Sequence, residues 1–188
     1  NYRRALGIFR EQGNRPMEAR YTSNLANLLD DTGRTVQAVG MYEMALDMLR
    51  EVGQPRTLGV CLGNLGVARQ KLGRLDAAYK AFSESIELLV KHSARLPAGA
   101  FLAMRGSLFL LLGEVGSAES DLMEAQARLT EEAALADQVQ FLMPLEVRLM
   151  AHRGEFDSGE QRVQDGVSGI LSADGELGKA VDLARGCL

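Results

Sequence analysis

Cysteine, proline and aromatic residues are scarce in this sequence. Its 188 residues include two cysteines, four prolines, no tryptophan and 5% aromatic residues. A small disulfide scaffold would need far more cysteine, and Cys61 and Cys187 lack the spacing of metal ligands. Glycine, at 20 residues, is far below the third that collagen requires, and the 46% hydrophobic content excludes a disordered chain. A globular protein of a reducing compartment remains, and we expect a cytoplasmic location.

An excess of one charge and a long hydrophobic run are also absent. The formal net charge of -4 offers no general attraction for nucleic acid or for an acidic membrane surface. The longest apolar run, residues 108–112, is far shorter than the roughly 20 residues that cross a bilayer. Residues 1–30 lack the apolar stretch of a signal peptide. Nucleic acid and membrane are therefore not expected as partners.

A repeat with a period of 40 residues runs along the chain. The segments YRRALGIFREQG (2–13) and YEMALDMLREVG (42–53) align at that spacing without gaps. Glycine recurs at 33, 73 and 113, and a step of 41 leads to Gly154. The segment RGSL (105–108) is answered by RGCL (185–188) two periods later. A register that is kept over several returns predicts a repeat architecture.

Each period contains two amphipathic helices. Apolar residues recur three and four positions apart, as in Leu58, Leu62 and Leu65, which is typical of a helix with one buried face. The recurring glycines separate the two helices of a pair, and looser Gly/Pro segments separate the periods. The expected helices span residues 1–12, 17–32, 35–52, 56–72, 75–92, 97–112, 115–132, 135–153, 156–171 and 176–188.

The segment 64–89, NLGVARQKLGRLDAAYKAFSESIELL, resembles a tetratricopeptide repeat. Small residues at the contact positions of this family let helices approach closely. The matching residues are Leu65, Gly66, Gly73, Ala78, Phe82 and Ser85, with Ala26, Ala38, Tyr42 and Ala45 before them and Gly106, Ala118, Leu122 and Ala125 after them. The resemblance implies an all-α fold: a right-handed superhelical solenoid of antiparallel helix pairs.

The resemblance covers nearly the whole chain, which we expect to be a single array over 1–188. Residues 1–16 would end a preceding repeat, and repeats would follow at 17–55, 56–95, 96–134 and, in degenerate form, 135–174. Residues 175–188 would begin a further repeat or form a capping helix. The period is longer than the basic repeat of about 34 residues, as in kinesin light chain and in bacterial signalling regulators, which the sequence resembles most. Incomplete repeats at both ends and the missing initial Met suggest a fragment of a larger protein.

Four positions depart from the family pattern. Arg105 and Glu146 stand where the family has Leu, and Gly159 and Gly166 replace Ala in the fourth repeat. A glycine inside a helix costs about 1 kcal/mol relative to alanine. We therefore expect the fourth repeat to be the loosest.

Catalytic and metal-binding motifs are missing. The sequence has no phosphate loop, no HExxH and no CxxC. His92 and His152 lie 60 residues apart, and Cys61 lies beside Leu62 on an apolar helix, where a buried structural residue is expected. The sequence thus predicts no enzyme activity, no catalytic residue, no metal and no cofactor.

The predicted solenoid offers a concave surface that is lined by the first helix of each pair. Such surfaces hold an extended segment or a helix of another protein. In the resembling families, asparagines on these helices hold a peptide backbone, because a carboxamide offers both a donor and an acceptor. The expected peptide-binding residues are Asn24, Asn27 and Asn64, with Arg20, Ser23, Asp30, Asp31, Val67, Gln70, Lys71, Ser107 and Leu110. Further neighbours on this surface are Val60, Gly63, Ala100, Ala103, Phe141, Arg148 and His152.

Two questions stay open at the level of sequence. The side chains of Asn24 and Asn64 could equally well form hydrogen bonds between neighbouring helices, which would orient the packing without contact to a ligand. The module itself is expected to bind another protein or peptide as a scaffold. The alternatives are a sensor region that binds a small molecule or signalling peptide to control an attached effector domain, and an accessory region of an enzyme. Self-association through the unfinished helices at the two ends is also expected.

Overall fold

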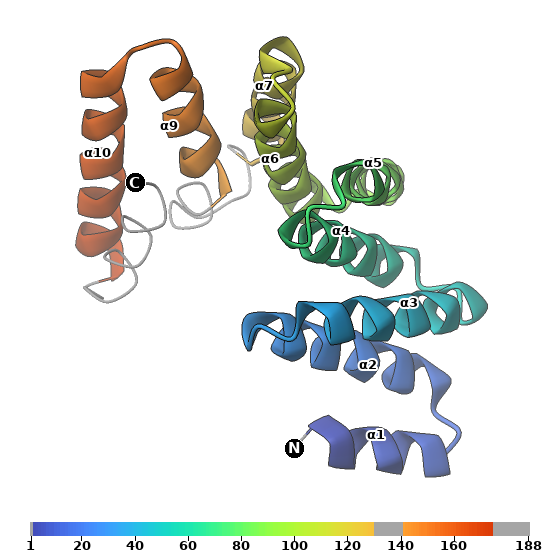
Figure 1. Cartoon of the computed structure of the whole chain (residues 1–188). Helices are drawn as coiled ribbons and strands as arrows, with labels where there is room; N and C mark the ends of the chain where they lie inside the picture. Colours follow the sequence, from blue (N-terminus) through green and yellow to red (C-terminus); the bar gives the residue numbers. More distant parts are fainter. Residues whose placement is uncertain (1, 130–140, 175–188) are drawn as a thin grey trace. The chain divides into compact units, whose positions relative to one another are not determined.

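The computed structural model describes residues 2–129 and 141–174, and these residues form nine α-helices and no strand (Figure 1). This confirms the all-α repeat fold. The helices are α1 (Tyr2–Glu11), α2 (Arg15–Asp31), α3 (Thr35–Glu51), α4 (Pro55–Lys71), α5 (Leu75–Lys91), α6 (Arg95–Leu111), α7 (Val115–Leu129), α9 (Met143–His152) and α10 (Phe156–Asp174). Their bounds lie within a few residues of the expected ranges. The expected start of a helix at 135 and the expected helix at 176–188 lie outside the described residues.

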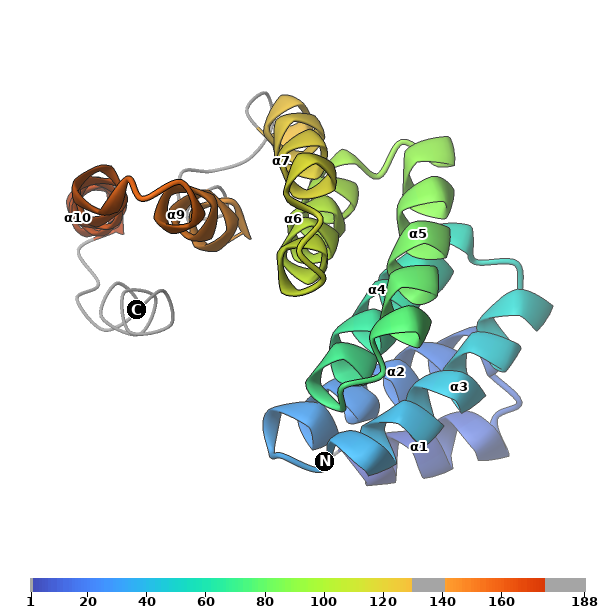
Figure 2. The ribbon, with the colours of Figure 1, turned by 45° about the horizontal axis from the view of Figure 1, so that its top comes forward.

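The chain divides into two compact units, residues 1–97 and residues 98–188, called here the N-terminal and the C-terminal unit. The N-terminal unit contains α1 to α5, and the C-terminal unit contains most of α6 together with α7, α9 and α10. Within the N-terminal unit α2 packs on α3, and α4 packs on both α3 and α5 (Figure 2). The proposed repeat boundaries stay a prediction.

Residues in the left-handed backbone conformation end the helices. Positive φ angles occur where the 40-residue period places glycine, both within and between helix pairs: at Gly13, Gly33, Gly53, Gly73, Gly113 and Gly154. Ser93 occupies the position that Gly13 and Gly53 hold in the earlier periods, and its φ is 55°. A side chain is disfavoured in this conformation because its Cβ approaches the following carbonyl oxygen. Ser93 is therefore the strained member of this series of turns.

Small residues bring α4 and α5 into close contact, as the resemblance implied. A Cβ at Gly66 would lie 2.8 Å from Cδ1 of Phe82, and one at Gly59 would lie 2.7 Å from Cγ of Leu89. The Ser85 hydroxyl donates a hydrogen bond of 2.6 Å to the carbonyl oxygen of Gly59. The two helices thus touch at backbone distance, and the rings and branched side chains of α5 fill the space that the glycines leave.

A buried carboxylate links the first helices of the N-terminal unit. Glu18 on α2 is 5% exposed and accepts a hydrogen bond of 2.7 Å from Nε of Arg10 on α1. Arg15 donates to the same carboxylate at 3.1 Å and reaches Glu51 of α3 at 3.2 Å. The hydrogen bond from Arg10 is the main reason why the pKa of Glu18 lies below its ordinary value. Three helices are thereby connected by a series of ion pairs that runs from Arg10 through Glu18 and Arg15 to Glu51.

Candidate functional site

One face of α2 carries four polar residues in a row. Arg20, Asn24, Asn27 and Asp31 are spaced by four, three and four positions, so they follow one another along the same side of the helix. Arg20 and Asp31 are exposed, and the two asparagines are half-buried. The equivalent positions of α4, one period later, hold Val60, Asn64, Val67 and Lys71. These eight residues form what we call the α2–α4 face.

The two helices of this face are joined by a hydrogen-bonded pair of asparagines. Nδ2 of Asn64 donates to Oδ1 of Asn27 at 3.0 Å, and the same oxygen accepts a bond of 2.7 Å from the hydroxyl of Tyr42 on α3. Asn64 thus makes the interhelical bond that the sequence left open, whereas the Asn24 side chain bonds to none of the described residues. Nδ2 of Asn27 and Oδ1 of Asn64 also have no partner among the residues that the structure describes. A donor and an acceptor therefore remain available on adjacent helices.

Tyr42 is the member of this cluster that the predicted site omitted. Its side chain is 2% exposed, and burial, together with the charge of Asp30, raises the pKa of its phenol above the ordinary value. It therefore stays a neutral donor that fixes the orientation of the Asn27 amide. The sequence held one sign of this role: the equivalent position one period later is Phe82, which has no hydroxyl, so the hydroxyl of Tyr42 is not needed for packing alone.

A second polar cluster lies at the C-terminal end of the same two helices. Lys71 Nζ contacts Oδ2 of Asp30 at 2.8 Å, and the Thr35 hydroxyl donates to Oδ1 of Asp30 at 2.8 Å. Asp30 is only 8% exposed, and Ser23, another predicted site residue, is 7% exposed. Both are thus buried between helices rather than presented on the face. Gln70 is half-buried and Lys71 is exposed.

Cys61 lies beneath the α2–α4 face. Its side chain is fully buried, and its thiol lies 3.8 Å from the carbonyl oxygen of Tyr42. Burial raises the pKa of this thiol to about 11. A thiol that stays protonated is a poor nucleophile, which agrees with the structural role expected for Cys61.

The remaining predicted site residues belong to the C-terminal unit. Ser107 on α6 is half-buried and donates to the carbonyl oxygen of Ala103 one turn earlier, at 3.1 Å. Leu110 is half-buried, and Arg148 and His152 on α9 are exposed. The asparagine pair has no counterpart here, because the positions of Asn27 and Asn64 hold Ser107 and Met104 in this period. The donor and acceptor pair is therefore a feature of the N-terminal unit.

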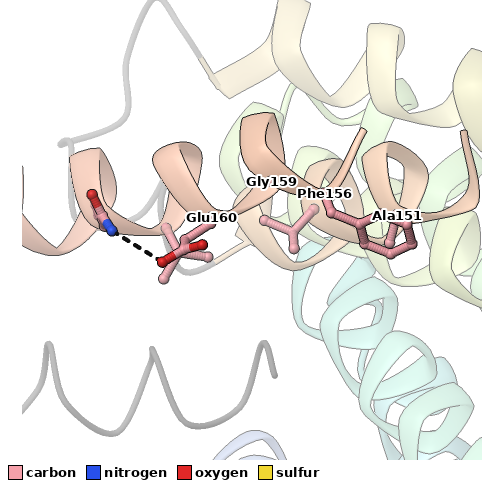
Figure 3. A pocket seen from close by; sticks show the side chains of 7 residues that line it. Ala151, Phe156, Gly159 and Glu160 are labelled. Atoms are coloured by element: carbon pink, nitrogen blue, oxygen red, sulfur yellow. Dashed lines mark hydrogen bonds between the residues drawn. The ribbon is translucent and has the colours of Figure 1, made fainter. Parts of the chain in front are cut away.

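A hollow of about 520 Å³ opens on the helix pair α9 and α10. Figure 3 shows Phe156, Gly159 and Ala151 around it. The lining is mostly apolar, and its polar members, Gln164 and Glu160, are joined by a hydrogen bond of 3.4 Å. Phe156 is 70% exposed. An apolar ligand of modest size fits such a hollow by volume.

In the described part of the chain, no group of three or more His, Cys, Asp or Glu residues is placed to hold a metal ion. None of the described helices has the length and apolar character that spanning a membrane requires.

The sequence and the fold were compared with those of known proteins. Residues 22–56 match the tetratricopeptide repeat model. The fold is similar to the crystal structure of BtubC (BKLC) from P. vanneervenii, with a TM-score of 0.74 and 22% sequence identity, over 93% of this chain and 72% of that chain. It is also similar to a putative kinesin light chain of Podosopora anserina with nearly identical TPR-like repeats, with a TM-score of 0.62 and 16% identity, over 91% of this chain and 88% of that chain. No match was found among curated proteins.

The molecule is therefore an all-α solenoid built from repeated helix pairs. Residues 22–56 carry a tetratricopeptide repeat, and the fold of the chain is similar to that of solved structures with such repeats. Repeats of this family generally mediate protein–protein interactions and typically carry no catalysis, so an interaction scaffold is the function supported at this level.

Proposed function

We propose that the protein is an interaction module whose α2–α4 face binds the backbone of an extended segment of a partner protein. One observation carries this proposal: the available donor of Asn27 and the available acceptor of Asn64 lie on two amides that are already bonded to each other at 3.0 Å. Such a pair complements the C=O and N–H groups of an extended backbone. The Tyr42 hydroxyl supports the proposal further, because it holds the Asn27 amide in one orientation.

The hydrogen bonds alone would give weak binding. Each is worth about 0.5 to 1.5 kcal/mol net. Val60 and Val67 flank Asn64 on α4 and are half-buried, so they offer apolar contact to the side chains of the bound segment. Asn24 extends the row of amides along α2 by one turn. The backbone contacts would thus hold any extended segment, and the valines would select among sequences.

The wider setting is also a proposal. We infer a cytoplasmic module without catalysis of its own, which acts within a bacterial signalling or regulatory protein. Support comes from the resemblance of its repeats to such regulators and from the low cysteine content.

Selection from a displayed library of random peptides tests the proposed face. Asn24→Ala is the cleanest variant because the Asn24 side chain bonds to none of the described residues, so its loss leaves the fold intact. We expect the selected peptides to bind Asn24→Ala about two- to tenfold more weakly than the wild type by calorimetry, and Asn27→Ala with Asn64→Ala more weakly still. Gln37→Ala, at an exposed position of α3, is the matched control and should bind normally. Equal binding by all variants would move the interaction to another surface.

The hollow on α9 and α10 favours a second candidate, a sensor of small apolar molecules. A metabolite that raises the unfolding temperature of the wild type, but not of Gly159→Leu, would support the sensor. Stabilisation that is equal in both proteins would exclude the hollow as its site.

A further inference from the structure

Two ion pairs replace apolar contacts in the C-terminal unit. Nε and Nη2 of Arg105 on α6 contact the two carboxylate oxygens of Asp121 on α7, at 2.9 and 2.8 Å. The Arg105 side chain is 18% exposed and that of Asp121 is 6% exposed. The positions one period earlier, Leu65 and Ala81, are both 2% exposed. A charge pair therefore stands at an inner contact between the two helices of a pair.

The next helix pair repeats this arrangement with the charges exchanged. Glu146 on α9 accepts a hydrogen bond of 2.6 Å from Nε of Arg162 on α10. The two members of each pair are separated by the same 16 positions, from 105 to 121 and from 146 to 162. In the first pair the base lies on the first helix, and in the second pair the acid does. The polarity thus alternates from one helix pair to the next.

The two helix pairs lie in direct contact. A Cβ at Gly106 would lie 2.6 Å from Cδ2 of Leu145, the neighbour of Glu146 along α9. Gln126 of α7 donates to Glu146 at 2.9 Å. If α9 took the place of α6 against α7, Glu146 would face Asp121. If α6 packed on α10, Arg105 would face Arg162. Either exchange would bring like charges together where little solvent screens them, and would leave each without its partner.

We propose that the alternating polarity is a pairing code, by which each first helix of the C-terminal unit accepts only its own second helix. The consequence is that α9 of one copy does not take the place of α6 on α7 of another copy, and α6 does not take the place of α9 on α10. The N-terminal unit has no such code, because the equivalent residues, Leu25 and Met41 in one pair and Leu65 and Ala81 in the next, are uncharged.

Inversion of one pair tests the code. Arg105→Asp with Asp121→Arg keeps an ion pair between α6 and α7 but places an acid on both first helices and a base on both second helices. We expect this variant, unfolded in urea and refolded at high concentration, to contain on the order of tenfold more exchanged dimer than the wild type. Light scattering after size-exclusion chromatography measures the dimer. Adding Glu146→Arg with Arg162→Glu restores the alternation, and the dimer should then fall back to the wild-type level.

The matched control inverts an ion pair that lies within one helix. Glu124 and Arg128 are bonded at 2.6 Å along α7, with side-chain exposures of 46% and 24%. Glu124→Arg with Arg128→Glu should leave the dimer fraction unchanged. Equal dimer in the wild type and in the single inversion would overturn the proposal. If the single inversion does not fold, the fourfold variant decides alone: the code requires that it folds as a wild-type-like monomer, and its failure to fold would reject the code.

Discussion

The two units solve the same packing problem with different chemistry. In the N-terminal unit, the inner position shared by the two helices of a pair is apolar: Leu65 and Ala81 are almost fully buried, and Leu25 and Met41 pack against the same core. In the C-terminal unit, ion pairs occupy these positions. An apolar contact stabilises without directional demand, whereas a buried ion pair contributes little net stability but tolerates few alternatives. The choice of residues at this one contact thus decides whether a helix pair gains stability or becomes selective for its partner helix.

Removing one member of a buried pair gives the largest expected effect. Arg105→Leu leaves the carboxylate of the buried Asp121 without its guanidinium. We expect the C-terminal unit to lose about 3 kcal/mol of unfolding free energy in urea titrations followed by circular dichroism.

The double variant Arg105→Leu with Asp121→Ala is the matched control, because it copies Leu65 and Ala81 of the N-terminal unit. It should return to within about 1 kcal/mol of the wild type or exceed it. If the double variant were as unstable as the single one, the apolar residues of the N-terminal unit could not replace the ion pair at this contact.

The close glycine contacts provide the next comparison. Alanine at Gly66 would press against the rigid ring of Phe82. Alanine at Gly106 would meet the end of the flexible Leu145 side chain most closely, with the carbonyl oxygen of Ala118 next at 3.3 Å. We expect Gly66→Ala to cost about 1 to 3 kcal/mol and Gly106→Ala to cost less. Thermal unfolding of both variants measures the difference.

Gly40→Ala is the control for helix propensity, because nothing lies within 4 Å of a Cβ placed there. It should be neutral or stabilise by up to about 1 kcal/mol. If Gly106→Ala lost more stability than Gly66→Ala, the less yielding contact would lie in the C-terminal unit, against our expectation.

The smallest effect is expected at the last turn of the N-terminal unit. Ser93→Gly would give this turn the residue that Gly13 and Gly53 supply at the equivalent positions. Relief of the left-handed strain, offset by the greater freedom of glycine in the unfolded chain, should stabilise by less than about 1 kcal/mol. Ser93→Ala, which keeps a Cβ, is the control and should not stabilise. If both variants unfold at the same temperature, Ser93 is not strained.

The local features of the fold and the residues of the α2–α4 face were predictable from sequence, whereas the hydrogen bonds that join these residues were not. Amphipathic periodicity predicted the helices, and the recurring glycines predicted the turns, because both depend on residues close together in the chain. Asn64 was recognised as a candidate, but its partner, Asn27, lies 37 positions away, and the Tyr42 hydroxyl reaches that amide from a third helix. Ser23 and Asp30 were predicted on the face, yet tertiary packing buries them.

Arg105 and Glu146 show the same limit from the opposite direction. In the sequence they are only departures from the family pattern, which has Leu at both positions. Only the packed structure places Asp121 opposite Arg105 and Arg162 opposite Glu146. The two departures then become two ion pairs of opposite polarity.

The sequence by itself determined the repeat, its helices and its turns, because helix periodicity and left-handed glycines are local properties of the backbone. The tertiary structure decided which polar groups are satisfied and which remain available, because hydrogen bonds and ion pairs depend on distances between helices that periodicity does not specify. The donor and acceptor that the asparagine pair leaves unbonded among the described residues arise at that level, as do the alternating charges of the C-terminal unit.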